Sequence, residues 1–304
     1  MEVKTVLCPV DFSPISLRNL RMAVEVSKRV GARLVIHHNL DVRPPGFLSV
    51  AWMWSEDHEA GEEEKAAEVP AKLQELFDQI PEGVEYEAKV TRGPMEETLL
   101  FVARGLPADL IVMGSHGKSG AEHDSLTEKI VIKAPCSVLT IGEGYVPEEV
   151  FDAEDIKPAD QLTMLVPVDF TPQGLGVLAA AIDLAFDMPH HMEVLHVVAQ
   201  TGAGDAAHEE REVEAARQRL RRMIPESLAS RVSVQVKVGG PAETVLAMAK
   251  ELDVLCVIMG AHGKGMLKRF LFGTTTMTIL HGAGCPVWFM PEALTKSLPG
   301  VAGS

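Results

Sequence analysis

The sequence predicts an α/β protein with two tandem domains, each a five-stranded parallel sheet flanked by helices. Two observations carry this prediction. First, four short segments of the amino-terminal half recur in the same order in the carboxyl-terminal half, which indicates a duplicated domain. Second, in each copy short apolar runs rich in β-branched residues alternate with helical stretches, as in parallel β-α-β units.

The recurring segments are visible in the printed sequence. They are VLCPVDFSP (6–14) with MLVPVDFTP (164–172), TRGPMEET (91–98) with VGGPAET (238–244), VMGSHGK (112–118) with IMGAHGK (258–264), and APCSVLTI (134–141) with AGCPVWFM (283–290). Small insertions and deletions separate the matches, as expected for two copies that have diverged.

Each element follows from this pattern. In the first copy we expect strands at 3–10, 32–40, 84–90, 110–114 and 137–141, with helices at 15–30, 62–80 and 95–105. In the second copy we expect strands at 162–168, 192–199, 231–238, 254–260 and 286–290, with helices at 173–187, 207–224 and 242–251 and one that begins near Thr274. The runs LIVM and VLCVIM are nearly continuously apolar, which is typical of strands buried on both faces.

These elements divide the chain into a first half (1–145) and a second half (161–292). Residues 146–160 are expected to form a linker, because the segment is acidic, contains prolines and lacks periodicity. Residues 293–304 are expected to form a poorly ordered tail.

Charge and composition exclude several classes of function. The net charge of −15 argues against binding to nucleic acid or to an anionic membrane, both of which need a basic surface. No apolar run is long enough to span a membrane. The four cysteines show no C-x-x-C spacing and no disulfide framework, so we expect a reducing, cytoplasmic compartment.

Ligands of parallel α/β sheets bind beyond the carboxyl ends of the strands, and two segments in each copy lie there. The first contains Asp11 or Asp169, which closes the first strand just before Ser13-Pro14 or Thr171-Pro172, a typical helix start. Such a carboxylate accepts hydrogen bonds from the ribose or base of a nucleotide. The alternative is that it only organises the turn, and the motif alone favours neither.

The second segment is rich in glycine. In the second copy Gly260-Ala-His-Gly263 is followed by nine residues and then by Gly273-Thr274. Glycines let backbone N–H groups approach phosphate oxygens, and a helix that starts near Thr274 directs its positive dipole at them. Hydroxyl and cationic side chains add further donors, namely those of Thr274, Thr275, Thr276, Lys264, Lys268 and Arg269. The alternative is a solvated basic loop. The matching segment of the first copy, Gly117-Lys118-Ser119, is not a Walker A loop, because Val112 stands where that motif needs glycine.

These residues resemble the universal stress protein family, and the likeness to a tandem member covers nearly the whole chain. The resemblance implies a Rossmann-like fold of the adenine nucleotide alpha-hydrolase-like type. It also implies an ATP site of pattern G-x2-G-x9-G-[ST], with bound Mg²⁺. By resemblance, Asp169 and Val197 would contact the ribose and adenine, Met259, Gly260 and Ala261 the nucleoside, and Gly263, Gly273, Thr274 and Thr275 the phosphates. The predicted site also includes Pro167, Val168, Phe170, Thr171, His262, Lys264 and Thr276.

The first copy departs from the pattern. After Gly117 the loop is three residues shorter, Asp124 replaces the glycine that faces phosphate, and Glu122 stands among residues that are cationic in the other copy. A carboxylate beside a phosphate costs roughly 1–4 kcal/mol. We therefore expect ATP in the second half alone.

The predicted function is that of an ATP-binding regulatory module that responds to stress and acts on an unknown protein partner. No catalytic base, nucleophile or metal triad is evident, so we lean against an enzyme. Alternatives are a slow ATPase, autophosphorylation on Thr274–Thr276, or binding of a non-nucleotide ligand or partner by the first half, where Trp52, Met53 and Trp54 lie. The resemblance implies an intramolecular pseudo-dimer through the fifth strands, with a homodimer left open. We expect no metal site made by histidines, and His37 and His196 to occupy equivalent structural positions.

Overall fold

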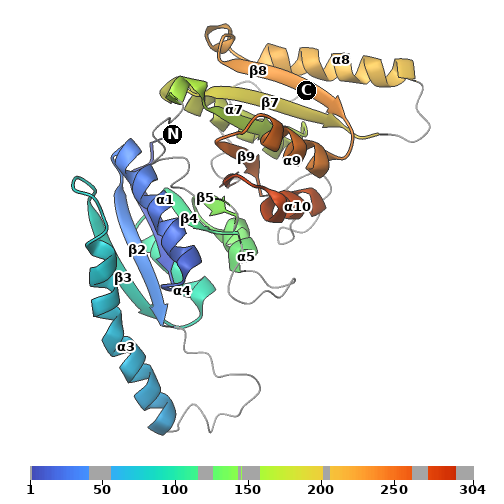
Figure 1. The fold of residues 1–304 in the computed structure, drawn as a ribbon. Coiled ribbons are helices and arrows are strands. Elements are labelled where there is room, and N and C mark those ends of the chain that lie inside the picture. Colours follow the sequence, from blue (N-terminus) through green and yellow to red (C-terminus); the bar gives the residue numbers. More distant parts are fainter. Residues whose placement is uncertain are drawn as a thin grey trace. The chain divides into compact units, whose positions relative to one another are not determined.

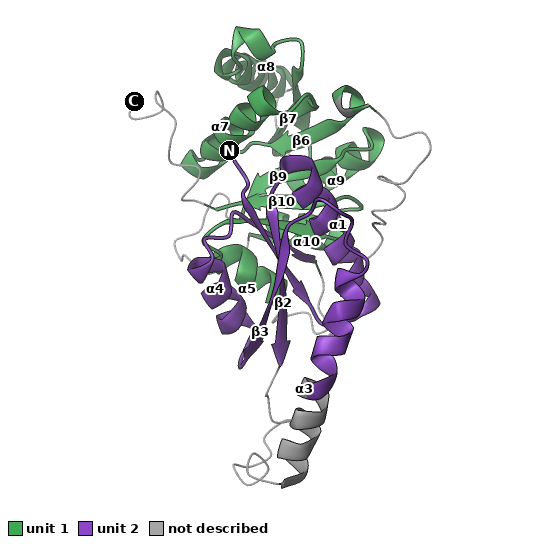
Figure 2. Ribbon diagram, turned by 90° about the vertical axis from the view of Figure 1, so that its left-hand side faces the viewer, with its two compact units in different colours: residues 1, 114–304 green, residues 2–113 purple. Residues whose placement is uncertain are grey.

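The computed structural model describes residues 2–40, 56–115, 126–142, 145, 158–200, 206–261 and 273–291, with the backbone alone for residues 56–66 and for residue 159. The chain forms two compact units, residues 2–113 and residues 114–304 (Figure 2). The fifth strand of the first sequence repeat therefore belongs to the same unit as the whole second repeat.

The unit of residues 2–113 is a parallel sheet with helices on both faces. Its elements are β1 (Thr5–Val10), α1 (Pro14–Val30), β2 (Arg33–Leu40), α3 (Glu56–Phe77), β3 (Tyr86–Arg92), α4 (Met95–Gly105) and β4 (Leu110–Gly114). The strand order is β3-β2-β1-β4. Figure 2 shows α1 and α4 on opposite sides of β2 and β3, as right-handed crossovers require when the strand order reverses.

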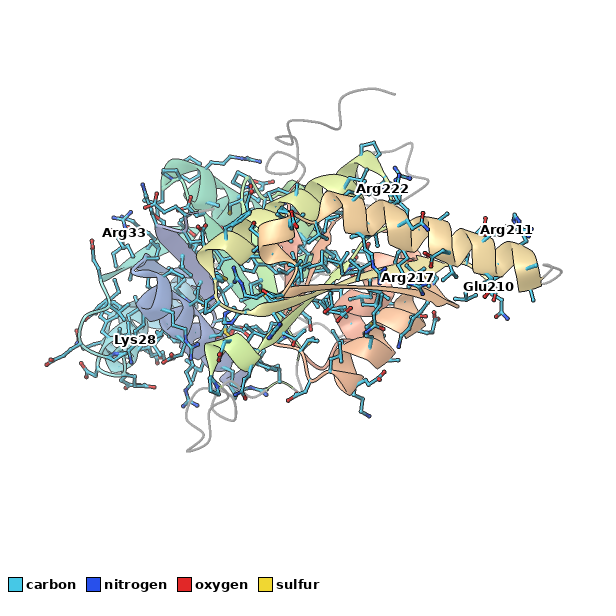
Figure 3. The ribbon with its side chains drawn as sticks, turned by 90° about the horizontal axis from the view of Figure 1, so that it is seen from above. Lys28, Arg33, Glu210, Arg211, Arg217 and Arg222 are labelled. Carbon is cyan, nitrogen blue, oxygen red and sulfur yellow. The ribbon has the colours of Figure 1, made fainter. Side chains whose placement is uncertain are left out.

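The unit of residues 114–304 contains the rest of the described chain (Figure 1). Its elements are α5 (Leu126–Lys133), β5 (Ser137–Ile141), η1 (Ala159–Gln161), β6 (Thr163–Pro167), α7 (Pro172–Asp187), β7 (His191–Val198), α8 (Ala206–Met223), η2 (Glu226–Leu228), β8 (Val232–Val238), α9 (Pro241–Glu251), β9 (Cys256–Gly260), α10 (Thr274–Gly282) and β10 (Val287–Met290). The strand order is β5-β10-β9-β6-β7-β8. Exposed arginines such as Arg211 and Arg222 lie along α8 (Figure 3).

One strand pair in this unit is antiparallel. Strands β5 and β10 pair with Trp288 opposite Leu139, and Thr140 Oγ1 donates to Val287 O at 3.3 Å. Phe289 is 1% exposed in this region. On the neighbouring helices, Glu128 Oε1 of α5 lies 3.4 Å from His281 Nε2 of α10. Hydrogen bonds and buried apolar side chains therefore join the two fifth strands of the sequence repeat.

The predicted fold class is confirmed, since both units are α/β with mainly parallel strands. Most elements begin and end within two residues of the expected bounds. Among the expected elements the largest difference is α3, which begins at Glu56 rather than near residue 62, and helix α5 was not expected from the sequence. None of the helices in the described part of the chain is long and apolar enough to span a bilayer.

Candidate functional site

The carboxyl end of β6 makes a tight turn into α7. Val168 N donates to Leu195 O at 2.8 Å, which extends the pairing with β7. Asp169 Oδ1 then accepts from Thr171 N at 3.1 Å and from Thr171 Oγ1 at 2.6 Å. Thr171 Oγ1 in turn accepts from Gly174 N at 3.0 Å, so Thr171 is the N-cap of α7, as its sequence predicts. The carboxylate of Asp169 thus organises the turn at the strand end where a ligand is expected.

Gly174 lies directly against the carboxylate of this turn. A Cβ at residue 174 would collide with Asp169 Oδ1. In the first half the equivalent residue is Ser16, whose hydroxyl accepts from Asp11 N at 3.2 Å. Asp11 Oδ1 accepts from Ser13 N at 3.0 Å, and Ser13 Oγ accepts from Ser16 N at 3.2 Å. The first half therefore makes the same turn without a glycine, and the Ser16 hydroxyl adds one bond to it.

An aromatic clamp holds the residue after the aspartate. Phe170 has a φ of 57°, in the left-handed region that is uncommon for a bulky side chain. Its ring packs on His196 with centroids 4.4 Å apart, and Arg219 Cζ lies 4.3 Å from the ring centroid. His196 Nδ1 donates to Val168 O at 2.6 Å. The clamp fixes the backbone on both sides of Asp169.

The first half repeats this clamp and corrects one prediction. Phe12 has a φ of 60° and packs on His38 at 4.6 Å, and His38 Nδ1 donates to Val10 O at 2.8 Å. His38 follows Val10 by 28 residues, as His196 follows Val168. The equivalent of His196 is therefore His38, and the expected equivalence with His37 is wrong by one residue. A shift of one residue in a strand places a side chain on the opposite face of the sheet.

The carboxyl end of β9 lies beside that of β6, because the two strands pair in parallel with Met164 opposite Cys256. Gly260 ends β9, and the side chain of Gln173 from the first turn of α7 covers it. A Cβ built on Gly260 would lie 3.1 Å from Gln173 Nε2 and 3.2 Å from its Cδ. Among the residues that the structure describes, Gln173 Nε2 is buried and has no hydrogen-bond partner. Gln173 belongs to none of the motifs that are visible in the sequence.

The remaining predicted residues form walls or lie outside the described chain. Val168, Met259 and Ala261 are buried, whereas Pro167 and Val197 are half-buried. Gly273 is the N-cap of α10 and supplies no side-chain cap, so backbone N–H groups are the donors that this helix start offers. Thr274 is exposed and Thr275 is half-buried, but Thr276 is only 3% exposed. His262, Gly263 and Lys264 lie outside the described residues.

A family model matches both halves of the chain. The model described as the universal stress protein family matches residues 2–142 and again residues 162–291. The chain belongs to the universal stress protein family. Universal stress protein MJ0531 of Methanocaldococcus jannaschii is 28% identical over 141 residues, which are 45% of this chain and 81% of that protein. The Thermus aquaticus universal stress protein in QAH/OAS sulfhydrylase 3′region is 32% identical over 142 residues, which are 45% of this chain and 98% of that protein.

The fold of the whole chain also has a solved counterpart. A universal stress protein from Archaeoglobus fulgidus DSM 4304 superposes with a TM-score of 0.64 at 18% identity, over 94% of this chain and 96% of that one. At that identity the likeness concerns the fold, and it extends over both tandem domains.

In the first half of this universal stress protein, Asn39 takes the place of Val197. Both residues directly follow the clamp histidine. Asn39 Nδ2 donates to Gly93 O at 2.8 Å, and Asn39 Oδ1 accepts from Thr91 Oγ1 at 2.9 Å and from Thr98 Oγ1 at 3.1 Å. A side chain that is polar and bonded within the protein thus replaces an apolar one at the position that we expect, from the resemblance, to contact the base.

His37 extends the network around Asn39 into the core of the first half. His37 is fully buried, and its Nε2 lies 2.8 Å from Thr91 Oγ1. Because the Thr91 hydroxyl donates to Asn39, it accepts from His37 Nε2–H, which leaves Nδ1 as an acceptor. That Nδ1 is buried and has no donor in the described part of the chain. Burial, with a smaller contribution from His38, lowers the pKa of His37 to about 4, so its imidazole is neutral at physiological pH.

Other predicted features remain without a structural account. Trp52, Met53 and Trp54 lie outside the described residues, as do Glu122 and Asp124 of the shortened loop. Among the described residues, no three His, Cys, Asp or Glu side chains gather as metal ligands. Mg²⁺ commonly binds through nucleotide phosphates and few protein ligands, so a dedicated cage of side chains is not what this ion requires.

Proposed function

We propose that this universal stress protein binds one adenine nucleotide, ATP with Mg²⁺, in its second half, at the carboxyl ends of β6 and β9. Its role is that of a regulatory, stress-responsive module rather than an efficient enzyme. The observation that carries the proposal is the corner formed by the Asp169–Gly174 turn and by Gly260 under Gln173. In that corner two strand ends and a helix start meet, and the sequence that begins at Gly260 carries the family's ATP pattern.

The proposed roles follow the order of the chain. Asp169 and Val197 would face the ribose and base. Gly260 would face the nucleoside with its backbone, while the Gln173 amide fills the space that a Cβ would take. Backbone N–H groups at Gly263 and at the start of α10 would hold the phosphates, where the helix dipole favours negative charge. Mg²⁺ would neutralise phosphate oxygens, with Thr274 and Thr275 as the nearest hydroxyl groups in the motif.

A difference between the halves supports binding in the second half alone. Asn39 uses its amide within the protein, so the first half offers no apolar contact where Val197 stands in the second. This difference is independent of the shortened, acidic loop that already disfavours phosphate in the first half.

The proposal is tested by isothermal titration calorimetry of the full chain with Mg²⁺-ATP. We expect one site per chain. Gly263→Asp should abolish binding, because a carboxylate would then face the phosphates, whereas the matched variant Gly117→Asp should leave it unchanged. Equal effects of the two variants, or two sites per chain, would contradict the assignment to the second half. Phosphate release measured on the same samples distinguishes a binding module from an ATPase.

A further inference from the structure

Gln173 in the first turn of α7 is a polar residue that the family's motif does not include and that the turn around Asp169 does not use. We propose that its side-chain amide recognises the nucleotide, with Nε2 donating a hydrogen bond to an oxygen of the α-phosphate, the phosphate nearest the sugar. This inference rests on the proposed function and extends it by a residue.

The first observation is an unpartnered donor at the site. Gln173 Nε2 is buried and has no acceptor among the described residues. The nearby Asp169 Oδ1 already accepts from Thr171 N and from Thr171 Oγ1. A buried donor without an acceptor is destabilising, so its presence needs an explanation. Nε2 has almost no accessible surface in the described structure, so a ligand oxygen would supply the missing acceptor after the amide turns toward the ligand.

The second observation is the position of the amide. Gln173 Nε2 and Cδ lie 3.1 Å and 3.2 Å from where a Cβ of Gly260 would be, so the amide lies directly over the last residue of β9. Gly260 is also the first glycine of the loop that the family pattern assigns to ATP. A group bound against the Gly260 backbone therefore comes within reach of Gln173.

The third observation concerns charge. Gln173 is the second residue of α7, which has proline at its first position and no acidic residue in its first turn. The positive end of the helix dipole favours an anionic oxygen over a neutral hydroxyl at this place. Hydrogen bonds to charged acceptors are also the stronger ones. Both effects favour the α-phosphate over the ribose hydroxyls, and they must outweigh repulsion from the Asp169 carboxylate in the turn before the helix.

The first half offers a natural contrast. Ile15 is the residue that follows Ser13-Pro14, as Gln173 follows Thr171-Pro172. The half with the degenerate loop therefore also lacks the amide donor. The same half replaces Val197 with Asn39, so the polar and apolar positions around the two strand ends are exchanged.

The test uses the full chain and two variants of similar size, Gln173→Met and Gln173→Glu. ATP affinity should fall about tenfold in Gln173→Met, because a hydrogen bond to a charged group is lost. It should fall further in Gln173→Glu, because a carboxylate repels the phosphate. The affinity for adenosine, which has no phosphate, should be the same in the wild type and in Gln173→Met.

A second measurement separates recognition from a structural role. Without nucleotide, Gln173→Met should melt about 2–4 °C higher than the wild type, since an unsatisfied buried amide is removed. Lower melting together with weaker binding would show that Gln173 supports the fold instead, and would overturn the inference.

Other results of the affinity measurements would overturn either the inference or the proposed function. Unchanged ATP affinity in both variants, or binding by Gln173→Glu as tight as the wild type, would overturn the inference while leaving the proposed function intact. A comparable loss for adenosine would move the contact from the phosphate to the sugar and overturn it as stated. A wild type that binds no nucleotide would refute the proposed function itself.

Discussion

The buried imidazole of His37 should make the first half sensitive to acid, and His37→Leu should remove that sensitivity. In the folded chain the pKa of His37 is lowered from 6.5 to about 4, first by burial and then by His38. The unfolded chain therefore binds a proton near pH 6.5 that the folded chain does not accept until about pH 4. Between those values the unfolded state holds more protons, so stability falls as the pH falls.

The size of the effect follows from the shift. Each pH unit of difference in pKa corresponds to about 1.4 kcal/mol, so the full effect is about 3 kcal/mol of unfolding free energy. This contribution is fully present above about pH 6.5, declines as the pH falls, and is lost below about pH 4. His37 is fully buried in the described structure, so solvent does not screen the effect.

This contribution to the free energy of unfolding can be measured by urea unfolding of the wild type and His37→Leu. The unfolding is followed by circular dichroism at several pH values between 7.5 and 4.5. Leucine is a sound replacement, because Leu195 precedes the clamp histidine of the second half as His37 precedes that of the first. Other titrating groups are common to both proteins and cancel in the difference. The variant should gain most of the 3 kcal/mol relative to the wild type as the pH falls. Parallel pH profiles would refute the account of a buried, neutral imidazole.

Three further predictions concern the turn and the paired fifth strands. Gly174→Ala should weaken ATP binding more than stability, because its Cβ would displace Asp169 Oδ1 whereas the first half makes the same turn with Ser16. Unchanged ATP affinity in calorimetry would contradict this role of the carboxylate. Thr171→Ala should cost about 0.5–2 kcal/mol in urea unfolding through loss of the N-cap, and Ser13→Ala a similar amount, whereas ATP affinity should fall only in the former. Phe289→Ala should cost about 3–5 kcal/mol in urea unfolding, and a loss under 1 kcal/mol would contradict its place in the core.

The sequence was sufficient for the fold because its signals are local and repeated. Apolar runs give the strands, Ser13 and Thr171 give helix starts, and the duplication allows each copy to check the other. The register of strand β2 was harder to predict from the sequence. HH at residues 37 and 38 presents two histidines in succession, and only the bond from His38 to Val10 O identifies which one belongs to the clamp.

The candidate site was less predictable for a physical reason. A motif marks residues whose backbone contacts a ligand, but it does not show which side chain from a neighbouring element covers them. Gln173 precedes Gly260, the first glycine of the motif's loop, by 87 residues in the chain, yet it lies against Gly260 in space. A clue was present in the contrast between Ile15 and Gln173 at matching helix positions. The network around Asn39 was missed likewise, because it joins strands β2 and β3 to helix α4.

The antiparallel pairing of β5 with β10 has a consequence for the history of the molecule. Strand β10 has a neighbour on each side, one of which was supplied by the other repeat of the same chain. The backbone groups along that border are already engaged, so another molecule could not add a strand there without first displacing β5. The two repeats belong to one chain, so each always has the other as its partner. They therefore need not both keep every binding function. The first repeat could therefore lose a binding loop while its strand β5 still pairs with β10 of the second repeat.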